Sequence, residues 1–230
     1  MALALDFGGT LARPGPNPDA ATVTEVLRGL PGASIPDGFA AVFDQVARRV
    51  RAADRQRGEQ TAFAEQVRLA ALESGAVLDD PAAATRAVFT AVPDAEIDAR
   101  AARALRELHD SGLICVLACD TQRPESVRRR TLRDAGISDC FDALVLSSTL
   151  GVRKPHPRFY AAVVEATGCP AAEILFVGDT PAKDVIGPRT HGMRAVLISA
   201  EGRPAELDPA IGVIAHLAEL PAYLESLHER

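Results

Sequence analysis

The chain has 230 residues, of which 47% are hydrophobic and only 4% aromatic, and its formal net charge is -6. This length suits one large domain or a core domain with a smaller one attached, and an acidic chain without a basic tract lacks the clustered cations that binding to nucleic acid requires. No apolar run approaches the roughly 20 residues of a membrane-spanning helix, and Asp6 interrupts the N-terminal apolar run too early for a signal peptide, so neither nucleic acid nor a membrane is an expected partner.

Five short apolar runs have the length and composition of buried β-strands. They occupy residues 2–5, 113–118, 143–146, 174–177 and 195–198. Each run is continuous instead of alternating, which is typical of parallel strands that are covered on both faces. Helical patterns lie between them over residues 94–110 and 158–167, and each is followed by a glycine, Gly112 or Gly168. This alternation predicts an α/β fold with a parallel sheet and a site at the carboxyl ends of its strands.

A long helical segment separates the first two predicted strands. Its apolar residues have helical spacing, and no strand-like run interrupts them. Sequences rich in proline or glycine stand at its start and within it, and Pro93 follows its end. We therefore expect an all-helical domain over residues 14–92, and a core domain formed by residues 1–13 and 93–230.

The first predicted strand ends in a short polar motif. Asp6 and Phe7 are followed by Gly8, Gly9 and Thr10. A carboxylate at a strand end, followed by two glycines, suits a nucleophile or a metal ligand whose neighbouring backbone approaches a ligand closely. The alternative interpretation is a simple Gly-Gly turn that follows a solvated aspartate.

The second predicted strand ends in Cys119, Asp120 and Thr121, which offer a thiol, a carboxylate and a hydroxyl. These groups can donate or accept hydrogen bonds with a ligand, or Thr121 can cap the helix that begins near Pro124. Arg123 lies close to this predicted site, and a guanidinium group can bind an anion through two parallel hydrogen bonds. We therefore expect Arg123 to contact an anionic substrate.

Two further motifs follow later strands. Lys154 precedes Pro155, and a residue before proline is held extended, so that Lys154 can be directed toward an anion. Asp179 and Asp184 follow the apolar strand of residues 174–177, and two such acids suit a cation bound by oxygen ligands. The alternative for Asp184 is the N-terminal cap of a helix.

The order of these groups resembles the haloacid dehalogenase-like hydrolase superfamily, whose four motifs supply a nucleophilic Asp, a Ser or Thr, a Lys and an acidic pair. The resemblance covers the core domain and implies a Rossmann-like sheet, and the helical insertion lies where that superfamily commonly has a cap domain. It further implies that Asp6 attacks phosphorus to form an aspartyl-phosphate and that Lys154 offsets the negative charge. Mg²⁺ would be held by Asp6, the carbonyl of Gly8, Asp179 and, behind them, Asp184. Substrate binding is expected from Gly9, Thr10, Cys119, Asp120, Thr121 and Arg123.

Two positions depart from the pattern of the family's phosphatases. Gly8 stands where these enzymes have a second aspartate, which protonates the leaving group, and Cys119 stands where they have Ser or Thr. General acid-base catalysis is typically worth about 10²- to 10⁴-fold in rate, so the resemblance implies a slow or unusual enzyme. An acid of the cap could replace the missing one, and the candidates are Asp44, Asp54, Glu59, Glu65 and Glu73.

Three functions remain open at this stage. The first is a Mg²⁺-dependent phosphohydrolase or phosphotransferase acting on a small phosphorylated metabolite. The alternatives are a binding or regulatory protein that has kept the fold, and a metal-independent 2-haloacid dehalogenase. A Schiff-base mechanism is excluded, because it needs a cap lysine and the two lysines, Lys154 and Lys183, lie outside residues 14–92.

The remaining cations and the cysteines carry weaker signals. Five cap arginines fall within ten residues, so on a helix they point in several directions and at most one or two can reach the cleft. They are Arg48, Arg49, Arg51, Arg55 and Arg57. The four cysteines form neither a C-x-x-C pair nor a secreted-type framework, which favours a cytoplasmic location.

Overall fold

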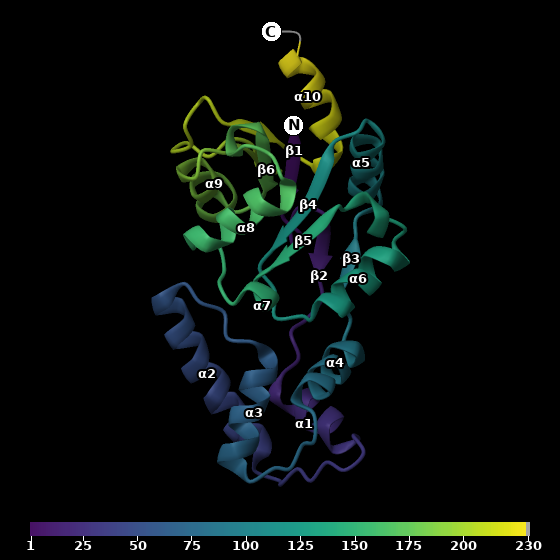
Figure 1. Cartoon of the computed structure of the whole chain (residues 1–230), viewed down its shortest axis with the longest axis vertical. Helices are drawn as coiled ribbons and strands as arrows, with labels where there is room; N and C mark the ends of the chain where they lie inside the picture. The colour runs from purple at the N-terminus through teal and green to yellow at the C-terminus, as the bar shows by residue number, and fades with distance from the viewer. Residues whose placement is uncertain (229–230) are drawn as a thin grey trace.

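The computed structural model describes residues 1–228, and a six-stranded parallel sheet lies at its centre in the order β5-β4-β1-β6-β7-β8 (Figure 1). The strands are β1 (Ala2–Leu5), β4 (Ile114–Cys119), β5 (Ala143–Leu146), β6 (Ile174–Gly178), β7 (Arg194–Ile198) and β8 (Gly212–Ile214). The chain runs from β1 outward to β4 and β5, and then returns to build β6, β7 and β8 on the other side. The strand order therefore reverses at β1, and ligands of open α/β sheets bind at the carboxyl ends of strands at such a point.

The position of β1 explains why its end is buried. All four of its residues are fully buried, and Leu5 pairs with Leu117 of β4 on one side and with Val177 of β6 on the other. The amide of Asp6 donates to the carbonyl oxygen of Val177 over 2.9 Å, so the pairing extends one residue beyond the strand. The side chain of Asp6 is thereby fixed between the ends of two neighbouring strands.

Helices cover both faces of the sheet. One face carries α5 (Ala99–Asp110), α6 (Glu125–Asp134) and α10 (Leu220–His228), and the other carries α8 (Pro157–Thr167), with the short helices α7 (Ser147–Leu150) and α9 (Gly187–Thr190) nearby. Alternate residues of β1 face opposite sides of the sheet. Leu3 and Leu5 pack toward α5, whereas Ala2 and Ala4 pack toward α8. The sheet thus has apolar layers on both sides, as the continuous apolar runs of its strands predict.

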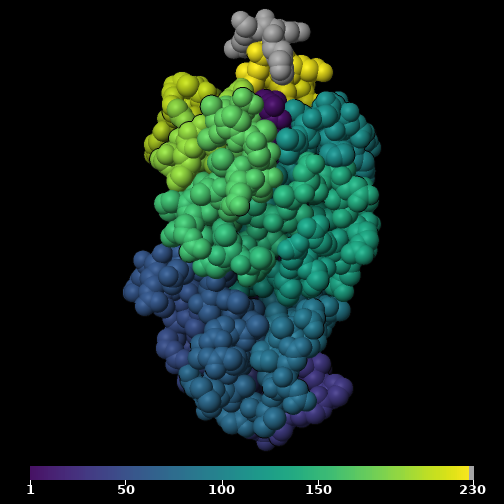
Figure 2. Space-filling model, viewed as in Figure 1, coloured from purple at the N-terminus to yellow at the C-terminus, as the bar shows by residue number. Residues whose placement is uncertain are grey.

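Four helices form a separate lobe beyond the carboxyl ends of the strands (Figures 1 and 2). They are α1 (Ala20–Arg28), α2 (Phe39–Arg57), α3 (Phe63–Ser74) and α4 (Pro81–Ala91). Their apolar faces meet in one cluster, which also includes Val127 of α6 and in which the rings of Phe63 and Phe89 lie 4.7 Å apart between centroids. We call these four helices and their connections the cap, and the division of the chain into two domains stays a prediction.

The α/β fold is confirmed, and each of the five predicted strands agrees with an observed strand to within one residue at either end. The expected helix over residues 94–110 is wrong at its start. Residues Ala95–Ile97 form β3, which pairs with β2 (Ala12–Pro14) as an antiparallel ribbon. The helix α5 begins later because the carboxylate of Asp98 accepts hydrogen bonds from the amides of Arg100 and Ala101 and so caps it.

Candidate active site

Three carboxylates meet at the carboxyl ends of β1 and β6. Asp6 follows β1, Asp179 follows β6, and Asp184 lies in the turn of helix η3 (Pro181–Ile186). One oxygen from each carboxylate lies within 4.8 Å of the others. Asp6 is 8% exposed and Asp184 is 1% exposed, whereas Asp179 is open to solvent. The solvated aspartate considered as an alternative for Asp6 is therefore not observed.

Lys154 neutralises part of this charge. Its Nζ atom lies 2.6 Å from Oδ1 of Asp6, 2.7 Å from Oδ1 of Asp184 and 3.0 Å from the carbonyl oxygen of Ala118. Burial by itself would lower the pKa of Lys154, but the neighbouring carboxylates outweigh burial and raise it above its usual value. Burial raises the pKa of Asp6 to about 6, while the ammonium group of Lys154 opposes that shift. Lys154 is therefore a charged group fixed beside the carboxyl end of β1.

Asp184 is held by hydrogen bonds to both of its oxygens. While Oδ1 accepts from Lys154, Oδ2 accepts from the amide of Thr180 over 2.9 Å. Gly178 makes this packing possible, since a Cβ atom at that position would lie 2.4 Å from Cγ of Asp184. Asp184 is thus a fixed, buried member of the carboxylate group and not the N-terminal cap of a helix.

The loop after Asp6 approaches the other motifs closely. Gly9 has a φ of 76°, and a Cβ atom there would lie 2.1 Å from Oδ2 of Asp179. A Cβ atom on Gly8 would lie 2.9 Å from Cγ of Pro14, so the proline ring occupies the space beside this backbone. Thr10 is buried, and its hydroxyl oxygen has no hydrogen-bond partner within residues 1–228. The loop therefore presents backbone, together with one unpaired hydroxyl, near the carboxylates.

The end of β4 contributes Asp120 directly to this site. Its carboxylate accepts from the backbone amide of Lys154 over 2.9 Å and from Nζ of Lys183 over 3.1 Å. The hydroxyl of Thr121 accepts from the amide of Arg123 over 3.0 Å, while Pro124 is the residue before α6, so Thr121 does not cap that helix. Asp120 thus links the second motif to the backbone of the third.

Cys119 contributes little polar chemistry. Its side chain belongs to the apolar cluster under the sheet, and its thiol donates to the carbonyl oxygen of Asp120 over 3.4 Å. Burial raises the pKa of Cys119 to about 12, so the thiol is neutral. The environment of this thiol is that of a buried small hydrophobe instead of the expected substrate contact.

The expected contact between Arg123 and the substrate needs correction. Arg123 is 5% exposed, and its guanidinium group donates to the carbonyl oxygens of Pro16 and Pro93 over 2.9 and 3.0 Å. Its Nε atom also lies 2.5 Å from Oδ1 of Asp94. Pro16 and Pro93 lie in the two segments that join the cap to the core, so Arg123 holds both segments and has no free face for an anion. The sequence analysis missed Asp94, whose only signal is a charge beside Pro93.

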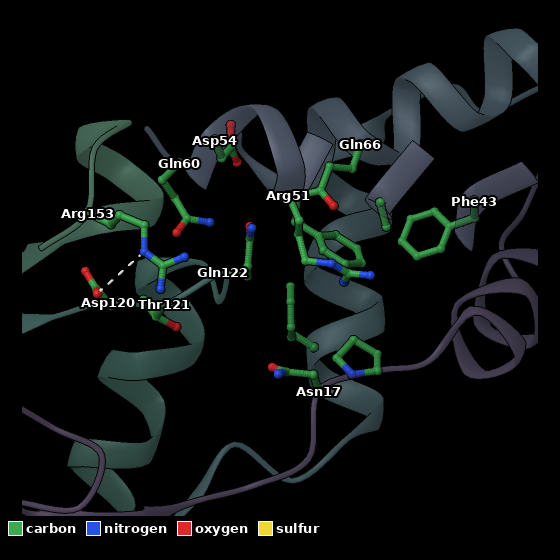
Figure 3. A pocket seen from close by; sticks show the side chains of 14 residues that line it. Asn17, Phe43, Arg51, Asp54, Gln60, Gln66, Asp120, Thr121, Gln122 and Arg153 are labelled. Carbon is green, nitrogen blue, oxygen red and sulfur yellow. Dashed lines mark ion pairs between the residues drawn. The ribbon is translucent and has the colours of Figure 1, made fainter. Parts of the chain in front are cut away.

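A cavity of about 290 Å³ lies between the cap and the core. The cap contributes Phe43, Arg51 and Gln66 to its walls, and the core contributes Asp120, Thr121 and Gln122 (Figure 3). The cavity reaches the active-site loops through Asp120, which is hydrogen-bonded to Lys154. The sequence pattern does not identify which cap residues line this cavity, because their positions follow from tertiary packing.

The five acids considered as a replacement proton donor have different surroundings. Asp54 lines the cavity, but both of its oxygens accept hydrogen bonds from Thr61. The other four lie in ion pairs with cap arginines and do not line this cavity. They are Asp44, Glu59, Glu65 and Glu73. Asp54 therefore has the best position of the five.

Comparison with known proteins gives a match to one protein family. Residues 1–192 match the family model described as haloacid dehalogenase-like hydrolase. The fold is similar to that of a 2-haloacid dehalogenase from Pseudomonas syringae, with a TM-score of 0.71, 18% identity and 98% of each chain covered. It is also similar to a haloacid dehalogenase-type (HAD) phosphatase from Thermococcus onnurineus, with a TM-score of 0.57, 20% identity and 97% of each chain covered. At such identities these two likenesses show the fold alone.

Curated relatives match over shorter segments. A phosphoserine phosphatase from Thermus thermophilus is 35% identical over 102 residues, which are 44% of this chain and 40% of the relative. A phosphoglycolate phosphatase from Cereibacter sphaeroides is 34% identical over 126 residues, which are 54% of this chain and 56% of the relative. The chain thus spans 40% and 56% of the length of these two relatives. Within residues 1–228, no helix has both the length and the apolar character needed to cross a membrane.

Proposed function

The chain belongs to the haloacid dehalogenase-like hydrolase family, a phosphatase-type hydrolase by its relatives, and we propose that it is a Mg²⁺-dependent phosphohydrolase or phosphotransferase that acts on a small phosphorylated metabolite through Asp6. The observation that carries this proposal is the group of three carboxylates at the ends of β1 and β6, two of which, Asp6 and Asp184, contact the buried Lys154. Phosphatase names among the curated relatives support the substrate class. The four free cysteines support the further proposal of a cytoplasmic location.

The residues present fit a magnesium ion. Mg²⁺ prefers hard oxygen ligands and usually binds through one or two carboxylates together with substrate phosphate. Asp6 and Asp179 would hold the ion with the carbonyl oxygen of Gly8, while Asp184, whose oxygens are already engaged, would orient the group. When bound, the ion would supply positive charge that offsets the charge of the phosphoryl oxygens.

The reaction then follows from the side chains. A carboxylate oxygen of Asp6 attacks phosphorus, the bond from phosphorus to the leaving oxygen breaks, and that oxygen keeps the electron pair and takes up a proton. Water or a second acceptor removes the phosphoryl group from Asp6 in the second step. The ammonium group of Lys154 stabilises the negative charge on the phosphoryl oxygens, because phosphoryl transfer depends mainly on positioning and electrostatic stabilisation.

The motif after β1 lacks the acid that would protonate the leaving oxygen. Gly8 has no side chain to protonate the leaving oxygen, and Pro14 lies against its backbone. Substrates with a good leaving group, such as acyl or aryl phosphates, need little help from an acid. We therefore propose that such phosphates, or phosphates that carry their own acid, are turned over faster than simple alkyl phosphates.

Phosphate release from p-nitrophenyl phosphate and acetyl phosphate tests the proposal. We expect release that depends on Mg²⁺, stops with EDTA and disappears in Asp6→Asn. Activity on 2-haloacids alone that survives EDTA would support the dehalogenase alternative instead. If no phosphate is turned over and the protein binds a ligand or another protein tightly, the binding or regulatory alternative is favoured.

A further inference from the structure

Arg51 is an unpaired cation at the cavity between the cap and the core. It lies on α2, and its side chain extends from that helix into the space between the two parts of the molecule (Figure 3). Of its neighbours in sequence, Arg48 pairs with Asp44 and Arg49 pairs with Glu73. Arg51 forms no ion pair within residues 1–228, so its guanidinium group is available to an anion.

The acids nearest to Arg51 in the cavity wall are already engaged. Asp54 follows Arg51 by three positions on α2, but its oxygens accept from the amide and the hydroxyl of Thr61 over 2.8 and 2.7 Å. Asp120, on the core side, lies 3.1 Å from Nζ of Lys183 and 3.7 Å from Nε of Arg153. Neither carboxylate therefore neutralises Arg51, although both lie in the wall of the same cavity.

The rest of the wall suits a small organic group. The rings of Phe43 and Phe63 form an apolar side, and their centroids lie 5.6 Å apart. Gln122 lies on the core side, and its buried amide oxygen has no hydrogen-bond partner within residues 1–228. A volume of about 290 Å³ leaves room for a short carbon chain with one further polar group.

We infer that Arg51 binds a carboxylate on the organic part of the substrate, so that the preferred substrates are phosphate monoesters of short hydroxy acids. This inference rests on the proposed function, because it places the phosphoryl group at Asp6 and the second anion at Arg51. A guanidinium group forms two parallel hydrogen bonds with a carboxylate, which gives both affinity and orientation. Cap and core then bind opposite ends of one substrate, and specificity is decided at the cavity.

Three two-carbon esters that differ in the charge of the second group test the inference. They are 2-phosphoglycolate, ethyl phosphate and phosphoethanolamine, which carry a carboxylate, a methyl and an ammonium group. We expect kcat/KM to fall in that order. Arg51→Gln should lower kcat/KM for 2-phosphoglycolate by about ten- to hundredfold, the range expected for a hydrogen-bonded charge, and leave ethyl phosphate nearly unchanged. Arg55→Gln is the matched control, since Arg55 lies on the same helix outside this cavity.

A binding experiment separates this inference from the proposed function. Calorimetry in magnesium buffer compares 3-phosphonopropionate with propylphosphonate, which have the same length but differ in the carboxylate, and neither can be hydrolysed as an ester. We expect the carboxylate to improve affinity in the wild type and in Arg55→Gln, but not in Arg51→Gln. Equal affinities for the two phosphonates, or equal losses in the two variants, would overturn the inference. If this pattern holds while no ester is hydrolysed, carboxylate recognition stands and the phosphohydrolase proposal fails.

Discussion

Lys154 lies between two buried carboxylates that would otherwise repel each other. The formal charges of Asp6, Asp179, Asp184 and Lys154 sum to about -2 for this group of four side chains. A divalent cation matches this remainder. The charge balance therefore supports the proposed magnesium site independently of the family, and it explains why one of only two lysines in the chain is fully buried.

Gly8→Asp would restore the missing acid only if Pro14 also changes. A Cβ atom on Gly8 would lie 2.9 Å from the proline ring, and forcing extra atoms into a packed region typically costs about 1–3 kcal/mol. We expect Gly8→Asp alone to lower the free energy of unfolding and to leave turnover of ethyl phosphate unimproved. In Gly8→Asp/Pro14→Ala the new carboxylate has room, and we expect turnover of ethyl phosphate to rise above that of Pro14→Ala. Urea unfolding and phosphate release measure the two effects.

Gly8→Ala is the control for this experiment, because it adds the same Cβ atom without a carboxylate. It should destabilise the protein as Gly8→Asp does and give no gain in turnover in either background. A stable Gly8→Asp protein that turns over ethyl phosphate faster than the wild type would show that the proline ring is no obstacle. Equal turnover by Pro14→Ala with and without the new acid would show that another group already donates the proton.

The elements differ in how far the sequence predicts them. Continuous apolar runs identify β1, β4, β5, β6 and β7, because strands buried on both faces have few other compositions. The ribbon of β2 and β3 gives no such signal, since each strand has three residues and β2 ends in Pro14. The strand ends also bring the carboxylates and Lys154 together as expected, because parallel strands end on one side of the sheet. The partners of Arg123 could not be predicted, since Pro16 and Pro93 meet only after the cap has folded.

Arg123→Gln should loosen the two segments that join the cap to the core. The substitution removes the hydrogen bonds to the carbonyl oxygens of Pro16 and Pro93 and the ion pair with Asp94, while Asp94 keeps Arg128 at 3.0 Å. Loss of buried hydrogen bonds to a charged group should lower the free energy of unfolding by about 1–3 kcal/mol. We also expect a protease of broad specificity to cleave near residues 14–18 or 92–94 faster than in the wild type, as measured by mass spectrometry.

Arg130→Gln provides the comparison for Arg123→Gln. Arg130 lies on α6, seven positions after Arg123, and its side chain is exposed on the surface of the helix. Its substitution should leave both unfolding and cleavage close to the wild type. If the two variants behave alike, or if cleavage in Arg123→Gln is spread over the whole chain, Arg123 has no specific effect on the connecting segments.

In the whole molecule, the cap contacts the core at a second place besides the connecting segments. The loop between α2 and α3 runs beside the loop that carries Lys154, and two backbone hydrogen bonds join them. The amide of Gln60 donates to the carbonyl oxygen of Gly151 over 2.9 Å, and the amide of Arg153 donates to the carbonyl oxygen of Gly58 over 3.2 Å. The position of the cap is thereby tied to the backbone next to Lys154.

Gln60→Pro should release this contact, because proline has no amide hydrogen to donate to Gly151. We expect amide hydrogen exchange to increase over residues 58–60 and 147–153, and KM for a small phosphate ester to change more than kcat, since the carboxylates and Lys154 lie outside the broken contact. Ala62→Pro is the matched control. Its φ of -57° suits proline, and its amide donates no hydrogen bond to the backbone within residues 1–228.

Gln60→Ala tests whether the backbone amide or the side chain of residue 60 is responsible for the effect of Gln60→Pro. It keeps the amide of residue 60 but removes the side chain, whose Oε1 atom lies 3.5 Å from the hydroxyl of Ser147. If the backbone bond holds the cap, exchange over residues 147–153 should stay near the wild type in Gln60→Ala and Ala62→Pro and rise in Gln60→Pro. An equal rise in all three variants would mean that the loop responds to any change in its sequence. Unchanged exchange in Gln60→Pro would mean that this backbone hydrogen bond does not hold the cap.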